Sequence, residues 1–224
     1  GSGQYNTISG YCSSIVGGIS NTASATSTFI GGGDRNIACG NNSSVVGGKS
    51  NTTSGYYSSI VGGFKNTSSG DCSFVGGGDR NIACEINSSV VGGTLNTASA
   101  NCTFIGGGLS NEICSGANTS TIVGGQLNII DGSTNVNFIG SGNSNYICAS
   151  TNGGNSIVGG CFNTLRPTGT GCGGSFIGGG RKNTGSGDFT FIGGGKCNLT
   201  SATLSTIVGG TLNTASGACS FIGG

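Results

Sequence analysis

An isoleucine or valine recurs at a nearly constant interval along the chain, and an asparagine follows it six residues later. These asparagines are Asn6, Asn21, Asn36, Asn51, Asn66, Asn81, Asn96, Asn111, Asn128, Asn145, Asn163, Asn183, Asn198 and Asn213. The first eight fall at every fifteenth position, and the later intervals lengthen and then return to the original value. A short fixed period is typical of stacked repeats, in which each unit buries its apolar surface against its neighbours. This period is too short for a pair of helices, so it predicts an all-β parallel solenoid (β-roll) of about 14 coils.

The residues on either side of the central isoleucine or valine vary together. A Ser or Thr before it is paired with a Val after it, as in Ser44-Val45-Val46, and a Phe before it is paired with a Gly after it, as in Phe29-Ile30-Gly31. Because residues i and i+2 of a strand project from the same face, the flanking pair shares one pocket and the central residue faces the other way. Both faces are therefore apolar, which predicts a strand that is covered on both sides.

The core of a thin coil covers only one of these faces, and we expect the other to form an interface between subunits. The interface candidates are Phe29, Phe74, Phe104, Phe138, Phe176, Phe191, Phe221, Val16, Val46, Val61 and Val91. The alternative is that these side chains decorate the exterior, which would leave a large exposed apolar patch.

A second strand is expected to begin at each asparagine, in the forms Asn-Thr-Ala-Ser and Asn-Ile-Ala-Cys. Glycines before the asparagine and small residues after the strand supply the two turns. The longer spacings place their extra residues between this strand and the next Ile/Val strand, within Ser115–Thr119, Gly132–Asn135, Ala149–Asn155 and Pro167–Gly174. One edge of the solenoid is thus expected to tolerate insertions, as surface loops do.

The sequence predicts a single repeat array over residues 1–224 that begins and ends in mid-repeat, since Phe221-Ile222-Gly223-Gly224 supplies the half-coil that the start lacks. This fits either a cut through a longer array or subunits that stack end to end.

Eleven cysteines indicate an oxidising, extracellular compartment. In each of two pairs, Cys72–Cys84 and Cys102–Cys114, the cysteines flank the same turn on neighbouring coils, so we expect them to form disulfides. Free thiols that act as small apolar side chains are the alternative. The chain has no C-x-x-C pair and no histidine, which argues against a zinc site.

Sequons for N-glycosylation are most accessible where they fall in expected turns, at Asn42, Asn87, Asn101 and Asn118. Those at Asn51 and Asn66 lie in the recurrent asparagine column, where a buried amide ladder is the competing role.

The composition of the chain argues against several classes of function. With no histidine and 7% charged residues, general acid–base catalysis has few candidates, so we expect neither an enzyme nor a cofactor site. The formal net charge of +1 and the lack of a basic run argue against nucleic-acid binding. No apolar run approaches the ~20 residues of a membrane span. Fifty glycines would suggest disorder, but strict apolar periodicity argues for a folded chain.

The repeat Ser/Thr-Ile-Val-Gly-Gly-x-x-Asn-Thr-Ala-Ser, at Ser14–Ala25 and Thr206–Gly217, resembles the head repeats of trimeric autotransporter adhesins, and similar repeats appear in viral and phage fibre proteins. The resemblance implies a left-handed parallel β-roll, three chains side by side, and adhesion to extracellular surfaces. This sequence differs in its cysteines, its sequons and its strict asparagine column.

These observations predict a structural or adhesive extracellular fibre that binds copies of itself, with cell-surface glycans or matrix as further partners. A glycan- or ice-binding module is one alternative, although its threonine column is interrupted at Ile37, Ile82 and Glu112. A viral or phage fibre shaft is another.

Overall fold

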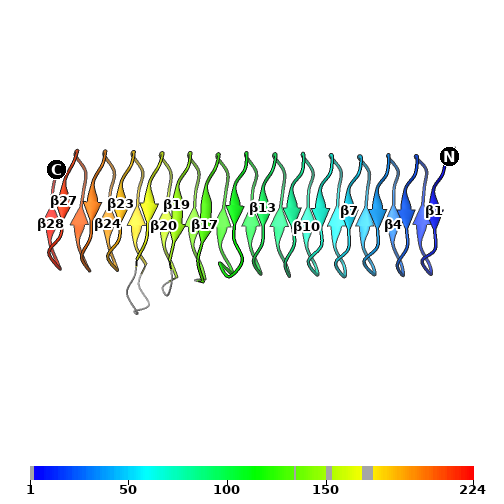
Figure 1. Ribbon diagram of the computed structural model, residues 1–224, viewed down its shortest axis with the longest axis horizontal. Helices are drawn as coiled ribbons and strands as arrows, with labels where there is room; N and C mark the ends of the chain where they lie inside the picture. Colours follow the sequence, from blue (N-terminus) through cyan, green and yellow to red (C-terminus); the bar gives the residue numbers. More distant parts are fainter. Residues whose placement is uncertain (1–2, 134, 150–152, 168–173) are drawn as a thin grey trace. The chain divides into compact units, whose positions relative to one another are not determined.

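The structure is a computed structural model, and it describes residues 3–133, 135–149, 153–167 and 174–224. All regular elements of these residues are short β-strands, which confirms the expected all-β fold (Figure 1). The chain divides into two compact units, unit 1 (Gly1–Leu109) and unit 2 (Ser110–Gly224). The same repeat runs through both units, with two strands in each coil.

Unit 1 contains seven coils. Their strands are β1 (Thr7–Ile8), β2 (Ser14–Ile15), β3 (Thr22–Ala23), β4 (Phe29–Ile30), β5 (Ile37–Ala38), β6 (Ser44–Val45), β7 (Thr52–Thr53), β8 (Ser59–Ile60), β9 (Thr67–Ser68), β10 (Phe74–Val75), β11 (Ile82–Ala83), β12 (Ser89–Val90), β13 (Thr97–Ala98) and β14 (Phe104–Ile105).

Unit 2 also contains seven coils. Their strands are β15 (Glu112–Ile113), β16 (Thr121–Ile122), β17 (Ile129–Asp131), β18 (Phe138–Ile139), β19 (Tyr146–Cys148), β20 (Ser156–Ile157), β21 (Thr164–Leu165), β22 (Phe176–Ile177), β23 (Thr184–Gly185), β24 (Phe191–Ile192), β25 (Leu199–Thr200), β26 (Thr206–Ile207), β27 (Thr214–Ala215) and β28 (Phe221–Ile222).

Within each unit the odd-numbered strands form one parallel sheet, the odd sheet, and the even-numbered strands form another, the even sheet. Thr22 pairs with Ile37 in the odd sheet, and Phe29 pairs with Ser44 in the even sheet. We call the turn that leads from an even strand to the next asparagine the glycine edge, and the turn that leads from an odd strand to the next even strand the insertion edge. The predicted parallel solenoid of about 14 coils is confirmed.

The central residue of each even strand points into the coil. From Ile30 to Ile207 these isoleucines and valines are fully buried. In unit 1 they face small residues of the odd sheet, so that Ile30 and Val45 pack with Ala23 and Ala38. A thin core of this kind leaves the flanking residues of each even strand outside it.

The asparagine column forms the buried amide ladder that the sequence suggested. The backbone N–H of Asn36 donates to Oδ1 of Asn21 at 2.9 Å, and its Nδ2 donates to the carbonyls of Gly32 and Gly48, both at 2.9 Å. Each amide thereby satisfies backbone groups of the turn as well as the next coil, since a buried polar group left without a partner is costly.

Glycine is required beside this ladder. At Gly48, where φ is +87°, an added Cβ would lie 2.3 Å from the carbonyl oxygen of Gly63 and 2.6 Å from Nδ2 of Asn51. A larger residue would therefore disturb both the turn and the amide that holds it.

Candidate interaction surface

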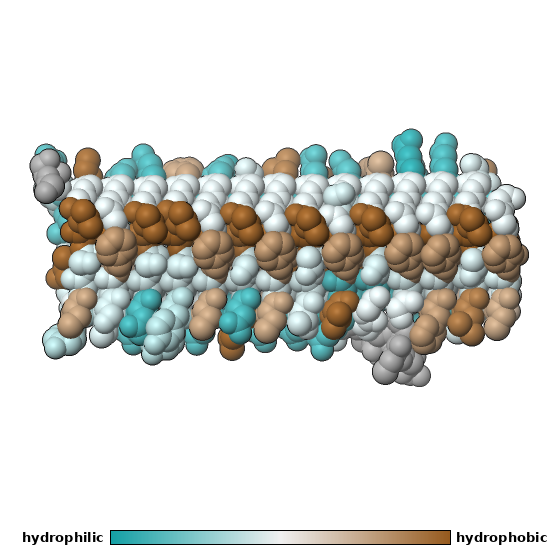
Figure 2. Space-filling view, turned by 180° about the vertical axis from the view of Figure 1, so that it is seen from behind, coloured by the Kyte–Doolittle hydropathy of each residue, from teal (hydrophilic) through white to brown (hydrophobic). Residues whose placement is uncertain are grey.

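The outward residues of the even sheet form a continuous apolar surface in each unit, which we call the apolar face. The valines occupy one row and the phenylalanines an adjoining row, both visible as brown bands in Figure 2. In unit 1 the apolar face comprises Val16, Phe29, Val46, Val61, Phe74, Val91 and Phe104, and in unit 2 Val123, Phe138, Val158, Phe176, Phe191, Val208 and Phe221. Most of these side chains remain exposed, with Val46 at 53% and Phe104 at 40%, while Phe74, Phe138 and Phe176 are half-buried. The predicted orientation is confirmed, because the central residues lie inside and the flanking ones outside.

A close approach between coils explains why glycine follows phenylalanine. An added Cβ at Gly31 would lie 2.3 Å from the carbonyl oxygen of Val46 in the next coil, and 3.5 Å from Cε1 of Phe29. Gly76 and Gly140 are confined in the same way. The sequence suggested that Phe and Gly vary together because they share one pocket. The phenylalanine ring does lie beside the glycine, but the backbone of the next coil also leaves no room for a side chain at the glycine position.

The apolar face carries no charge. The outward positions of the even strands hold only Ser, Thr, Val, Phe and Gly. In unit 2 the rings of Phe176 and Phe191, on consecutive coils, are stacked with centroids 5.3 Å apart and planes inclined by 8°. A surface of this composition gains free energy from contact with another apolar surface rather than from ion pairs.

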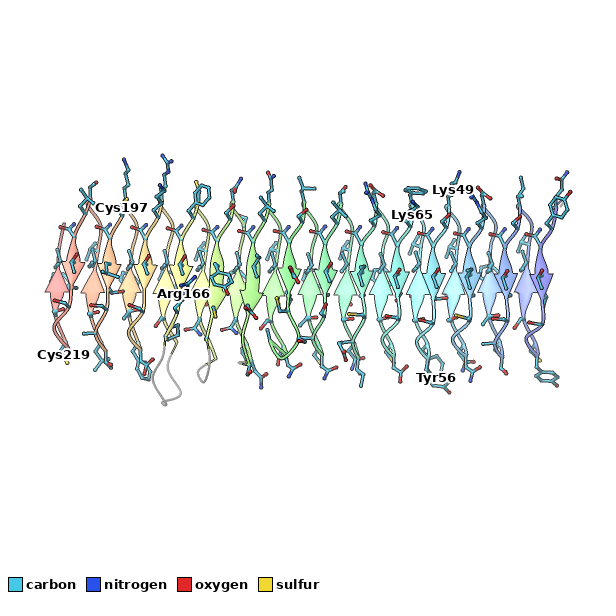
Figure 3. The ribbon with its side chains drawn as sticks, in the orientation of Figure 1. Lys49, Tyr56, Lys65, Arg166, Cys197 and Cys219 are labelled. Atoms are coloured by element: carbon cyan, nitrogen blue, oxygen red, sulfur yellow. The ribbon has the colours of Figure 1, made fainter. Side chains whose placement is uncertain are left out.

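The outer face of the odd sheet is different. In unit 1 it carries threonine and serine, with isoleucine and cysteine at two coils. In unit 2 the hydroxyl of Tyr146 donates to Oδ2 of Asp131 at 3.0 Å, and the guanidinium of Arg166 lies 5.3 Å from the centre of the Tyr146 ring (Figure 3). Hydrogen bonding to Cys148 and burial raise the pKa of the Tyr146 hydroxyl.

The same cluster contains a thiol that does not ionise readily. Burial, followed by the charges of Glu112 and Asp131, raises the pKa of the Cys114 thiol to about 12. Because the thiolate is the nucleophilic form, this cysteine is unreactive near neutral pH. The described residues contain no group of three or more His, Cys, Asp or Glu side chains suited to a metal ion.

The predicted disulfides are absent from the structure. Ten cysteines lie in the described residues and all are free thiols, including Cys72, Cys84, Cys102 and Cys114. Cys172 lies outside the described residues.

The direction of the Cys84 side chain gives the physical reason for the first pair. Its Sγ lies 3.4 Å from Oγ of Ser99 and 3.6 Å from the carbonyl oxygen of Ala98, both on the following coil. Cys72 lies on the preceding coil, exposed in the insertion-edge turn with φ of 55°. In the second pair, Cys102 occupies the same kind of exposed turn position, and Cys114 is half-buried on the odd sheet.

The four sequon asparagines expected to be accessible all lie at the insertion edge. Asn87 is exposed, whereas Asn42, Asn101 and Asn118 are half-buried. Glycosylation of these residues stays a prediction. Asn51 and Asn66 are fully buried in the amide ladder.

A second, sparser ladder at the insertion edge was not anticipated. Oδ1 of Asn41 accepts the N–H of Thr26 at 3.1 Å, and Oδ1 of Asp71 accepts the N–H of Tyr56 at 2.8 Å. Oδ1 of Asn101 accepts the equivalent N–H one coil earlier, at 3.2 Å. The signal was present in the sequence, because these acceptors recur at one position of alternate coils from Asn41 to Asn101.

Comparison of the chain with protein-family models and with curated proteins found no match. Among the described residues, no helix has the length and apolar character needed to cross a membrane. Inference about function therefore rests on the apolar face.

Proposed function

We propose that this chain is a structural or adhesive extracellular fibre protein that binds copies of itself through the apolar face. The observation that supports the proposal is that every coil of each unit places a Val or Phe on the apolar face, and most of these side chains are exposed. Large exposed apolar patches on folded proteins usually mark interaction sites.

Magnitudes favour association over many coils. Full burial of a Val or Phe side chain contributes about 1.5–3 kcal/mol, so covering the exposed half contributes about 1 kcal/mol. Two apposed units with seven such residues each gain on the order of 14 kcal/mol from this burial. Loss of translational and rotational freedom costs about 4–15 kcal/mol, so contact over a few coils would not suffice and association requires contact over at least a whole unit.

A second copy is the partner that fits best. Successive coils rise by about 4.8 Å, the spacing of paired strands, and only a chain with the same rise keeps both rows in register over many coils. Each coil places a large side chain in one row and only Ser, Thr or Gly in the other, so the large side chains of one copy can enter the gaps of the other. The outward positions offer no charges, so a partner recognised by ion pairs is disfavoured.

Sedimentation velocity of the full chain over a range of concentrations tests this proposal. Phe104→Asp should weaken self-association at least tenfold while the circular dichroism of the β-sheets is unchanged. Ile37→Asp is the matched control, because Ile37 is also 40% exposed but lies on the odd sheet. A chain that remains monomeric at high concentration, or variants that weaken association equally, would refute the apolar face as the interface.

The hydroxyl-bearing odd sheet of unit 1 is the observation that favours the alternative, a module that binds glycans or ice. Thr22, Thr52, Thr67 and Thr97 form a partly exposed column there. A flat Thr lattice would have to be continuous to match a crystalline ligand, and Ile37 and Ile82 interrupt it. Thermal hysteresis that is lost in Thr52→Tyr, with self-association intact, would favour this alternative.

A further inference from the structure

Three cations lie together at the glycine edge of unit 2. Arg181 and Lys196 are bridge partners on consecutive coils, and Lys182 adjoins Arg181; all three are exposed. We call these three residues the basic edge. Cys197, labelled in Figure 3, marks this edge in unit 2.

Hydrogen bonds fix the backbone from which these side chains project. Lys182 has a left-handed φ of 57°, and its N–H donates to the carbonyl of Cys161 at 2.9 Å. The N–H of Cys197 donates to the carbonyl of Arg181, also at 2.9 Å. Groups fixed in place before binding lose less entropy when a ligand arrives.

Two acids of the unit 1 glycine edge pair with three of its four cations. Arg35 lies 3.1 Å and Lys49 3.3 Å from Oδ2 of Asp34, and Arg80 lies 2.8 Å from Oδ2 of Asp79. The hydrogen bond from Arg35 lowers the pKa of the Asp34 carboxyl, so this acid is ionised at neutral pH. Lys65, the fourth cation of unit 1, lies over the ring of Phe64 at 5.0 Å (Figure 3).

The basic edge has no such compensation. Among the described residues of unit 2 none forms an ion pair with Arg181, Lys182 or Lys196, and the glycine edge there holds no acid. The three acids of unit 2 lie elsewhere, Glu112 and Asp131 on the odd sheet and Asp188 at the insertion edge.

We propose that the basic edge binds an anionic polysaccharide, a chain with sulfate or carboxylate groups. The Arg181 guanidinium offers a planar fork to one anionic group, and the two ammonium groups offer point charges to that group or its neighbours. Phe162 is half-exposed one coil before Lys182 and presents an apolar surface to a sugar ring. A nucleic acid is the weaker candidate, because its affinity grows with the number of phosphates neutralised and this edge offers only three cations.

The proposal does not depend on self-association, since the glycine edge is a different surface from the apolar face. Dextran sulfate is a suitable probe for the full chain, with unsulfated dextran as the uncharged comparison. Arg181→Gln/Lys182→Gln/Lys196→Gln should lower the affinity at least tenfold. The control Arg35→Gln/Lys49→Gln/Arg80→Gln removes the same charge from paired positions of unit 1 and should change the affinity less than twofold.

A gain of affinity tests the site without removing any residue from it. Thr211 is the bridge partner of Lys196 on the next coil, so Thr211→Lys should tighten binding several-fold. With three charges engaged, the logarithm of affinity should fall with the logarithm of salt concentration with a slope of about −2 to −3.

Three results would overturn the proposal. The first is equal loss of affinity in both triple variants, which would show a response to net charge alone. The second is no binding of dextran sulfate by the parent chain or no gain in Thr211→Lys. The third is tighter binding of double-stranded DNA than of dextran sulfate, which would assign the edge to a different ligand class.

Discussion

Six coils of unit 1, those that begin at Asn21 through Asn96, differ in length from the first four coils of unit 2, and an inward side chain marks the difference. From Asn21 to Asn96 the asparagines follow one another at a constant interval, and the inward residue of each odd strand is Ala, Ser or Thr. The four longer coils of unit 2 instead bury Ile113, Ile130, Ile147 and Leu165 at this position. The first coil is the exception, because it has the regular length but carries Ile8, which is 50% exposed. Among the coils with a buried inward residue, a bulkier interior coincides with a longer insertion edge.

Close packing explains the coincidence. The even strands supply Ile or Val in both regions, so the odd strand decides how much volume a coil must enclose. The coil after the last long one shows how the volume is balanced. Its inward residue is Gly185, where an added Cβ would lie 2.6 Å from Cδ2 of Leu165 on the preceding coil. A large side chain there is accommodated by the absence of one on the next coil.

The largest effect is expected from truncating the buried inward side chain of one of the four longer coils. Ile130→Ala removes most of a fully buried side chain and should lower the free energy of unfolding by about 2–5 kcal/mol. Chemical denaturation of the full chain measures it. A loss below about 1 kcal/mol would mean that the long coils collapse freely and that the inward residue does not set their size.

Overfilling a regular coil should cost somewhat less. Ala38→Ile places the side chain of an expanded coil within a coil of the shorter, regular length and should lower stability by about 1–3 kcal/mol. Replacing Gly40–Asn42 in that variant with Ser-Gly-Ala-Asn-Thr, the turn of the first long coil, should recover most of the loss. If the longer turn gives no recovery, interior volume and coil length are not linked.

Cysteines of the two regions should differ in their rates of alkylation. Cys114 has a pKa raised to about 12, so its thiolate is scarce at pH 8, and its alkylation should accelerate about tenfold per pH unit until it levels off near pH 12. The exposed Cys102 should react first. Because the folded form favours the neutral thiol, the stabilisation from this group is complete at neutral pH and is lost only as pH rises through the raised pKa. Mass spectrometry of alkylated peptides checks the order, which faster labelling of Cys114 at pH 8 would contradict.

Much of the fold could be predicted from the sequence because the repeat fixes position. The spacing placed Ile30 inside the coil, Phe29 outside it and Asn36 in a ladder, and the structure agrees at each. Period alone does not say toward which neighbouring coil a side chain leans, and for that reason the expected Cys72–Cys84 pairing is not found in the structure.

Of the two candidate surfaces, the sequence predicted the apolar face but not the basic edge, for a related reason. The apolar face follows from short runs of consecutive residues such as Phe29-Ile30-Gly31 and was visible in the sequence. The basic edge joins Arg181 to Lys196, which lie one full repeat apart along the chain and become neighbours only when the chain is folded on its period. A search for basic runs along the chain therefore missed it.

Cryo-electron microscopy of the full chain at micromolar concentration tests the central claim most directly, because it locates the apolar face within any assembly. The account predicts copies in lateral contact, with the Val46 and Phe104 rows buried between them and the glycine edges exposed. Single particles without partners, or assemblies that leave both rows facing solvent, would contradict it.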